Sequence, residues 1–380
     1  MACLTTLLQE RIHCGPDRDT AACLPSGKVQ PCCGGEWELQ TKFIREALLM
    51  SSEIIRYHGF PSEEYEVTTE DGYILAFSRI PAGRNSQNTG MTYKESLRPP
   101  VLLHHGILGD ATHWIANRPN NSLGFVLADA GYDVWLGNSR GNTWSLKHKT
   151  LKPCQKEFWQ FSFDEIGKYD IPAELNFIMN KTGQKNVYYI GHSEGSAAGF
   201  IAFSTYPDLS QKIKAFFALA PVITTTHATS PLVMFTQLPQ PLIRYVSQGL
   251  RSFILSQRWI SAFITFLLCL QSRTDSYIGH YPAGTSVQNV IHCIHSGLFP
   301  VLQTAPPVYK IEEIKIPIAV WSGGQDKFAD PKDMAKLLPR ITNLIYHEHF
   351  PIWGHLDFIW GLDATEKMYL KIIELLKKYH

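Results

Sequence analysis

The sequence of 380 residues has no long apolar run, no excess of charge of one sign and no regular set of metal-binding cysteines. Its longest apolar segment, Trp259 to Leu270, is shorter than the ~20 residues that a membrane-spanning helix needs, so no transmembrane segment is expected. Lys and Arg number 35 against 34 Asp and Glu, which argues against a broad nucleic-acid-binding surface. The first ten residues lack the apolar run of roughly 7–15 residues that a secretory signal requires, so no signal peptide is expected in this chain.

The cysteines are few and unevenly distributed. Five of the eight lie in the first tenth of the chain, and no CxxC…CxxC pattern occurs. No structural zinc site is therefore expected, and no other pattern in the sequence points to a metal or a cofactor. The 44% of hydrophobic residues against 18% charged residues is enough to bury a sizeable core.

The distribution of patterns along the chain divides it into four parts. Residues 1–45 show little periodicity and are expected to be poorly ordered. Strand and helix patterns alternate through residues 46–221 and again through residues 311–380, which is typical of a mainly parallel sheet with helices on both faces. Residues 222–310 interrupt this alternation with prolines and an apolar helical segment, and are interpreted as an inserted, mostly helical cap.

Short apolar runs mark the expected strands. Residues 65–69 and 73–78 flank Glu-Asp-Gly and predict a hairpin. Further strands are predicted at 101–105, 132–136, 187–190, 215–220, 316–321 and 344–346. Helical spacing predicts helices at 163–180, 193–205 and 364–378.

The sharpest motif is Gly-His-Ser-Glu-Gly at residues 191–195, directly after a predicted strand and before a predicted helix. The glycines allow the abrupt turn that holds the middle side chain in an exposed position, so Ser193 is predicted to be a nucleophile. A serine needs a base within hydrogen-bond reach, and the base needs a third group that fixes its tautomer. On this architecture the acid and the histidine follow the serine in the order Ser, Asp, His.

Three aspartates compete for the acidic position. Asp326 follows a late buried strand and a Gly-Gly loop, and is preferred. Asp330 precedes Pro331 and fits a helix cap better, and Asp333 lies close by.

Four histidines are candidates for the base. His347 and His349 continue the alternation of the last strand and are interpreted as structural. His355 follows Gly354 in a loop that can reach the strand ends, and is the predicted base. His192, next to the serine, is expected to point away and to be packed or hydrogen-bonded.

Acyl transfer also needs two donors for the oxyanion of the tetrahedral intermediate. One is the backbone N–H of Glu194, the residue after the serine. The other comes from the loop after the strand at 101–105, where the N–H of Ile107 is predicted and that of Leu108 is the neighbouring alternative.

Several stretches resemble the acid lipase family of the α/β-hydrolases, the group of gastric lipase and lysosomal acid lipase. The longest match is Leu-Ala-Asp-Ala-Gly-Tyr-Asp-Val-Trp-Leu-Gly-Asn-Ser-Arg-Gly-Asn-Thr-Trp at 127–144. The others lie at 65–74, 105–108, 120–123, 161–166, 217–221, 282–289 and 354–360. The resemblance implies the α/β-hydrolase fold and a lipase with the triad Ser193, Asp326 and His355, acting without a cofactor on neutral lipid esters such as triacylglycerols and cholesteryl esters. It also implies a lysosomal or secreted protein.

The chain departs from the family pattern at the residue after the nucleophile and in the cap. The family usually has Gln where this chain has Glu194, and the cap looks shortened. An ionised carboxylate roughly 7 Å from the oxyanion would oppose it by about 2 kcal/mol at an effective dielectric constant of ~20. Activity is therefore expected where Glu194 is protonated, which favours acidic surroundings.

Three interpretations of function remain open from the sequence. The first is the lipase, the second a catalytically impaired lipid-binding relative, and the third an esterase for small soluble esters. In the cap, six apolar residues at helical spacing either form plain core or make transient contact with a lipid surface: Phe253, Ile254, Trp259, Phe263, Phe266 and Leu267. Two sequons, at Asn120 and Asn180, are possible glycosylation sites.

Overall fold

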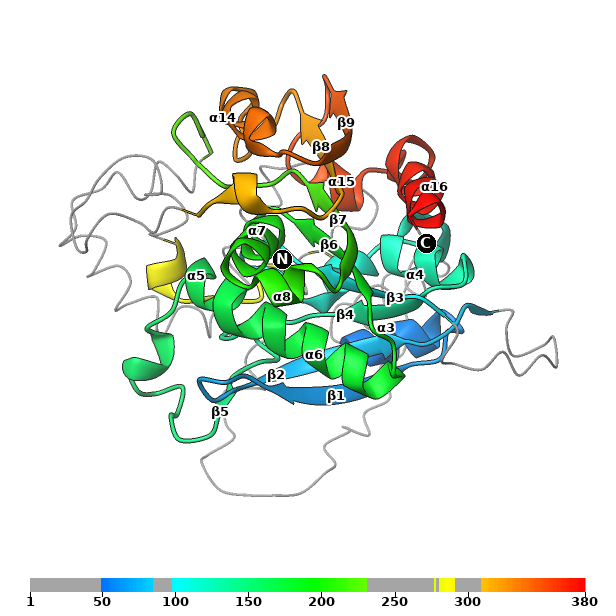
Figure 1. Ribbon diagram of the computed structural model, residues 1–380. Coiled ribbons are helices and arrows are strands. Elements are labelled where there is room, and N and C mark those ends of the chain that lie inside the picture. The colour runs from blue at the N-terminus through cyan, green and yellow to red at the C-terminus, as the bar shows by residue number, and fades with distance from the viewer. Residues whose placement is uncertain (1–48, 85–97, 231–276, 278–279, 291–308, 380) are drawn as a thin grey trace, which may run out of the picture. The chain divides into compact units, whose positions relative to one another are not determined.

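The computed structural model describes residues 49–84, 98–230, 277, 280–290 and 309–379 (Figure 1). Of the expectations above, those for residues 1–45 and for the six apolar cap residues lie outside the described residues. The same holds for most of the segment 222–310.

Within the described part of the chain, nine strands form one mixed sheet in the order β1-β2-β4-β3-β6-β7-β8-β9, with β5 paired to β2. The pairs from β4 to β9 are parallel, and β2 runs antiparallel to β1, β4 and β5. The strands are β1 (Glu63–Thr68), β2 (Tyr73–Ile80), β3 (Pro100–His104), β4 (Asp133–Leu136), β5 (Lys147–His148), β6 (Val187–His192), β7 (Ile213–Leu219), β8 (Ile318–Gly323) and β9 (Leu344–Phe350).

Helices cover both faces of the sheet. In Figure 1, α6, α7 and α8 lie in front of it, and α3, α4 and α16 lie on the opposite side. The α-helices are α3 (Ser51–Tyr57), α4 (Leu123–Asp129), α5 (Phe163–Glu165), α6 (Ile171–Thr182), α7 (Glu194–Thr205), α8 (Pro207–Ser210), α14 (Pro331–Leu337), α15 (Asp357–Trp360) and α16 (Leu370–Lys378). Two π-helical turns, η6 (Ile166–Asp170) and η10 (Thr365–Tyr369), lead into α6 and α16.

Short 3₁₀ turns complete the described elements. They are η3 (Ala111–Trp114), η4 (Pro119–Asn121), η5 (Glu157–Trp159), η8 (Ile311–Glu313) and η9 (Leu338–Arg340). The predicted mainly parallel sheet with helices on both faces is therefore confirmed, and every strand predicted from an apolar run is found within a few residues of its expected ends.

The central strands are apolar because both of their faces are covered. Every residue of β3, β4, β6 and β8 is buried. The outer strand β1 instead alternates between partly buried and exposed residues over most of its length. Parallel strands buried on both faces need continuous apolar sequence, which explains why these runs could be recognised.

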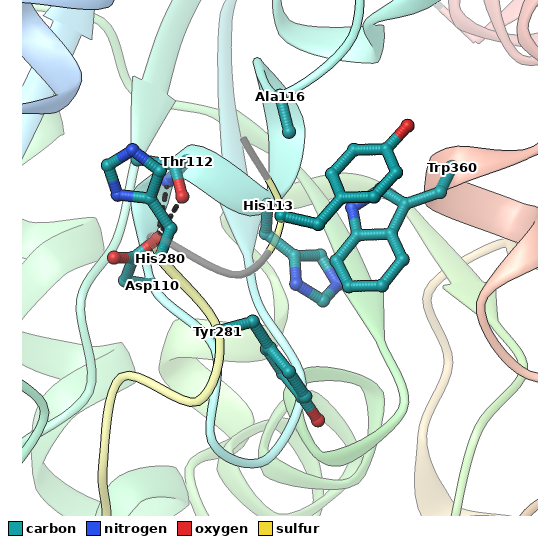
Figure 2. Close-up of a pocket in the computed structure, with 8 residues that line it drawn as sticks. Asp110, Thr112, His113, Ala116, His280, Tyr281 and Trp360 are labelled. Carbon is teal, nitrogen blue, oxygen red and sulfur yellow. Dashed lines mark hydrogen bonds between the residues drawn. The ribbon is translucent and has the colours of Figure 1, made fainter. Parts of the chain in front are cut away.

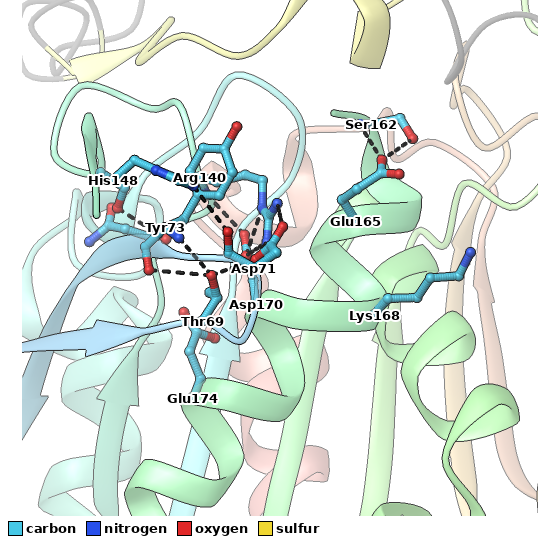
Figure 3. A network of polar contacts seen from close by, with 12 residues as sticks. Thr69, Asp71, Tyr73, Arg140, His148, Ser162, Glu165, Lys168, Asp170 and Glu174 are labelled. Atoms are coloured by element: carbon cyan, nitrogen blue, oxygen red, sulfur yellow. Dashed lines mark hydrogen bonds and ion pairs between the residues drawn. The ribbon is translucent and has the colours of Figure 1, made fainter. Parts of the chain in front are cut away.

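A buried arginine ties three segments together beside the sheet (Figure 3). The guanidinium of Arg140 donates to Asp170 at the end of η6 and to Asp71 in the turn between β1 and β2, with distances of 2.8 Å and 2.9 Å. It also lies 4.1 Å from the centre of the Tyr73 ring. Because Asp170 is fully buried, this pairing compensates a charge that would otherwise be costly to bury.

Candidate active site

Ser193 occupies a sharp turn between β6 and α7. Its backbone has φ 54° and ψ −117°, a conformation that residues other than glycine rarely adopt. The Ser193 N–H donates to the Leu219 carbonyl at the end of β7, at 2.9 Å, which holds the strained residue in place.

The two glycines of the motif are required by close backbone contacts. A Cβ atom at Gly191 would lie 2.5 Å from the backbone of Gly195, and one at Gly195 would lie 2.3 Å from the His104 carbonyl oxygen. Neither close contact could be relieved by rotation of a side chain, because the atoms that the added Cβ would contact belong to the backbone.

The structure brings Ser193, His355 and Asp326 into one hydrogen-bonded chain. The distance from Ser193 Oγ to His355 Nε2 is 2.7 Å, and that from His355 Nδ1 to Asp326 Oδ2 is 2.8 Å. A carboxylate only accepts, so Nδ1 of His355 carries the proton and Nε2 is free to accept from the serine hydroxyl. This is the arrangement that a serine nucleophile and its base require.

Asp326 is held as an anion by its surroundings. Burial by itself would raise its pKa, but the His355 ring and two backbone N–H groups outweigh burial and bring the pKa below its usual value. Those N–H groups, of Phe328 and Ala329, each donate to Asp326 Oδ1 at 2.8 Å. These contacts therefore favour the charged form of the Asp326 carboxyl group.

The rival aspartates lie in other contacts. Asp330 caps α14, where its side chain accepts from the Lys332 N–H at 2.8 Å. Asp333 accepts from the backbone N–H of His227 and contacts that residue's ring Nδ1 at 2.7 Å.

The rival histidines of the last strand also have other partners. His347 and His349 extend from β9, and each ring lies 3.0 Å from the hydroxyl of Ser322 on β8. These contacts fit the structural interpretation made from the alternation of the strand.

The loop that carries Ile107 and Leu108 passes directly beside Ser193. A Cβ atom at Gly106 would lie 3.0 Å from Cβ of Ser193. The Gly106 carbonyl accepts from the Gly109 N–H at 3.0 Å and contacts the His105 ring at 2.8 Å. These contacts fix the peptide that contains the Ile107 N–H, because the carbonyl and the N–H of one peptide share a plane.

The segment from Tyr281 to Ala283, which is expected in the cap, also fixes this loop. The Tyr281 hydroxyl donates to the Ile107 carbonyl at 3.1 Å, and the Ala283 N–H donates to the Leu108 carbonyl at 2.6 Å. Leu108 itself has φ 61°. The pattern Pro-Ala-Gly-Thr-Ser at 282–286 was visible as a family stretch, but its contact with the loop was not predictable from spacing.

Glu194, the residue after Ser193, is buried. Burial raises its pKa to about 7, a hydrogen bond from Asn289 opposes the rise, and the charge of Asp170 adds to it. The Asn289 amide lies 2.6 Å from Glu194 Oε2. The carboxyl is therefore largely protonated in acidic solution.

The remaining candidates lie on the surface. Asn120 and Asn180 are both exposed, as glycosylation would require. Among the described residues, no three His, Cys, Asp or Glu side chains are grouped so as to hold a metal ion. No helix in the described ranges is both long and apolar enough to cross a bilayer.

Comparison with known proteins identifies the family. Residues 51–118 match the partial α/β-hydrolase lipase region, and residues 99–257 match the α/β-hydrolase fold. The chain is 48% identical to lipase member M of Mus musculus, with 88% of this chain and 87% of that protein covered. The chain belongs to the acid lipase family of the α/β-hydrolases. The resemblance stated from the sequence is thereby confirmed.

Two further relatives have similar sequence identity to this chain. The lysosomal acid lipase/cholesteryl ester hydrolase of Homo sapiens is 48% identical, covering 86% of this chain and 90% of that protein. The gastric triacylglycerol lipase of Homo sapiens is 46% identical, covering 88% of this chain and 92% of that protein.

Solved structures share the fold. A thermophilic esterase from Thermogutta terrifontis has a TM-score of 0.54 and 18% identity, and covers 84% of this chain and 99% of its own. Naproxen esterase from Bacillus subtilis has a TM-score of 0.51 and 13% identity, and covers 90% of this chain and 99% of its own. At such low identity these structures indicate the fold alone.

Proposed function

We propose that this acid lipase family member is a serine ester hydrolase that cleaves neutral lipid esters, such as triacylglycerols or cholesteryl esters, and so takes part in lipid breakdown. The observation that carries the proposal is the hydrogen-bonded chain from Ser193 through His355 to Asp326. The names of two relatives, gastric triacylglycerol lipase and lysosomal acid lipase/cholesteryl ester hydrolase, support this class of substrate.

The reaction begins at the serine hydroxyl. Ser193 Oγ attacks the ester carbonyl while His355 Nε2 accepts its proton, and the charged Asp326 stabilises the imidazolium that forms. His355 then gives the proton to the departing alcohol, which leaves an acyl group on Ser193. Water, activated by the same histidine, releases the fatty acid and restores the serine.

The oxyanion of each tetrahedral intermediate rests on backbone donors. The N–H of Glu194 is one donor and that of Ile107 the other, with Leu108 as the neighbouring alternative. The closeness of Gly106 to Ser193 and the fixed carbonyls of this loop support the assignment. Loss of one such donor typically lowers kcat by about 10²–10³.

Two experiments test the proposal. A fluorophosphonate probe should label the wild-type protein and fail to label Ser193→Ala, and a wild-type protein that resists labelling would favour the catalytically impaired lipid-binding relative. Rates on tributyrin, triolein and cholesteryl oleate then rank the substrates. Hydrolysis of tributyrin alone would favour the esterase for small soluble esters.

A lysosomal or secreted location is part of the same proposal. It is supported by the name of the lysosomal relative and by the exposure of Asn120 and Asn180. Removal of N-linked glycans from protein made in animal cells should shift its mass, and Asn120→Gln should abolish part of the shift. Contact of the cap with a lipid surface stays a prediction from the sequence.

A further inference from the structure

A second chain of hydrogen bonds reaches the backbone of the candidate base, His355. His192 Nε2 lies 2.9 Å from the backbone carbonyl oxygen of His355, and His192 Nδ1 lies 3.0 Å from Nε2 of His113. The His192 and His113 side chains are buried, with exposed fractions of 1% and 5%. Neither contact involves the imidazole of His355, which is already bonded to Ser193 and Asp326.

The partners determine where the protons lie. A carbonyl oxygen only accepts, so Nε2 of His192 must carry a proton and donate it to His355. In a neutral imidazole the other nitrogen is then an acceptor, so Nδ1 of His192 accepts from the N–H at Nε2 of His113. Both rings therefore have one defined neutral tautomer.

The hydrogen bonds of His192 connect two parts of the candidate site. His192 is the last residue of β6 and directly precedes Ser193. His355 lies in the loop between β9 and α15, and the His192 and His355 ring centres are 4.9 Å apart. A hydrogen bond from His192 to the His355 backbone therefore couples the nucleophile turn directly to the loop that carries the base.

We propose that His192, held by His113, is a positioning residue that fixes the backbone of His355 relative to Ser193. This inference rests on the proposed function, because it assigns His192 a role in the same reaction. The hydrogen bond to the His355 carbonyl restricts rotation of that residue's backbone. An enzyme whose base is misplaced by 1 Å can lose about a hundredfold in rate.

His192 and His113, joined by a hydrogen bond, form a relay to the His355 backbone. The surroundings keep both rings of this relay neutral in acid. Burial lowers the pKa of His192 to about 3, with repulsion from His355 as the next cause, and burial likewise lowers the pKa of His113. The titratable groups near the two rings come from several elements. His104 and His105 lie at the end of β3 and in its loop, Asp110 lies beside His113, and Asp326 and His355 lie in the loops after β8 and β9. Tyr277, His280 and Tyr281 line the cavity at His113. An ordinary histidine would be charged below about pH 6.5, and a charged His192 could no longer accept from His113.

At its far end the relay borders a small cavity. His113 lines a cavity of about 10 Å³ together with Tyr281 and Trp360, and its ring projects between these two side chains in Figure 2. A cavity of this size holds at most about one water molecule. With an exposed fraction of only 5%, the His113 ring is closely packed by its neighbours, which favours its position as the donor to His192.

Substitution at His192 tests the proposal through a split between kcat and KM. His192→Leu removes both hydrogen bonds, and kcat should fall about tenfold to a hundredfold while KM changes little. His192→Gln offers an amide that can both donate and accept, so it should recover most of kcat. The control is His347→Leu, which removes an exposed histidine bonded to Ser322 outside the relay and should keep wild-type kcat.

A spectroscopic measurement on the wild-type protein tests the proposal even if the His192 variants fail to fold. Ring ¹⁵N signals of the wild-type protein at pH 5 should show His192 and His113 as neutral tautomers protonated at Nε2, with assignment through His113→Gln. A charged His192, or one protonated at Nδ1, would overturn the inference. So would a folded His192→Leu with wild-type kcat, whereas absence of fluorophosphonate labelling in the wild type would count against the proposed function instead.

Discussion

The side-chain amide of Asn289 donates a hydrogen bond of 2.6 Å to Oε2 of Glu194, and both side chains are buried. The two residues are 95 positions apart in the chain. Asn289 also donates to the Thr285 hydroxyl at 3.0 Å, so its amide is oriented from its own segment. The residue after Ser193 thus carries a carboxyl group whose neutral polar partner among the described residues is Asn289, and the charge of Asp170 also acts on it.

The protonation of Glu194 should set the upper pH limit of activity. Because its pKa is raised to about 7, the neutral form predominates below that pH and the anion above it. The anion would oppose the oxyanion by about 2 kcal/mol at roughly 7 Å. We expect wild-type kcat to fall by about tenfold or more as the pH rises through 7, and Glu194→Gln to keep its rate to higher pH.

A second variant separates this explanation from a general effect of pH. The hydrogen bond from Asn289 favours the ionised form of Glu194, so Asn289→Ala should move the fall in kcat to higher pH. The measurement is the pH–rate profile of the three proteins on one soluble ester. Identical profiles for wild type and Glu194→Gln would refute the prediction.

The same carboxyl should make stability depend on pH. The folded protein binds the Glu194 proton more tightly than the unfolded chain does, because the pKa rises from 4.5 to about 7 on folding. The free energy of unfolding should therefore fall as the pH rises from 4.5 to 7, by about 3 kcal/mol from this group. Urea unfolding of wild type and Glu194→Gln at pH 4.5, 6 and 7.5 measures the difference, and parallel curves would contradict it.

Replacement of Asp326 by asparagine should affect the reaction far more than the fold. The amide would still occupy the space beside His355 but could not stabilise the imidazolium or hold the required tautomer, and such a change costs about 10⁴ in kcat in a comparable triad. Asp330→Asn is the matched control, because Asp330 only caps α14, and it should retain near wild-type kcat. Comparable losses in the two variants would argue against the assignment of Asp326.

The elements that the sequence predicted well are those whose cause is local. The apolar runs of β3, β6 and β8 are continuous because both faces of the sheet are covered. Such burial is recognisable in the sequence as consecutive apolar residues. The turn at Ser193 is equally local, because its glycines are neighbours in the sequence. Family membership was recognisable for the same reason, from long contiguous stretches such as 127–144.

The contacts that the sequence could not predict are those between distant segments. Nothing in the spacing indicated that Asn289 would lie against Glu194, or that Tyr281 would bind the carbonyl of Ile107. His192 was correctly expected to be packed or hydrogen-bonded, but its partner, the backbone of His355, depends on where the loop after β9 runs. Side-chain type alone carries no information on such a path.

The second glycine of the turn provides a final prediction, on the packing that supports Ser193. A Cβ atom at Gly195 would lie 2.3 Å from the carbonyl oxygen of His104 and 2.6 Å from that of His105, so the loop of the proposed oxyanion donors would have to move. Gly195→Ala should lower the free energy of unfolding by about 1–3 kcal/mol or more and reduce fluorophosphonate labelling strongly. Gly354→Ala is the control for stability, because its Cβ atom would lie 3.7 Å from the nearest atoms, an ordinary contact. A Gly195→Ala protein with wild-type stability and labelling would mean that the strand end and the loop do not pack as closely as described.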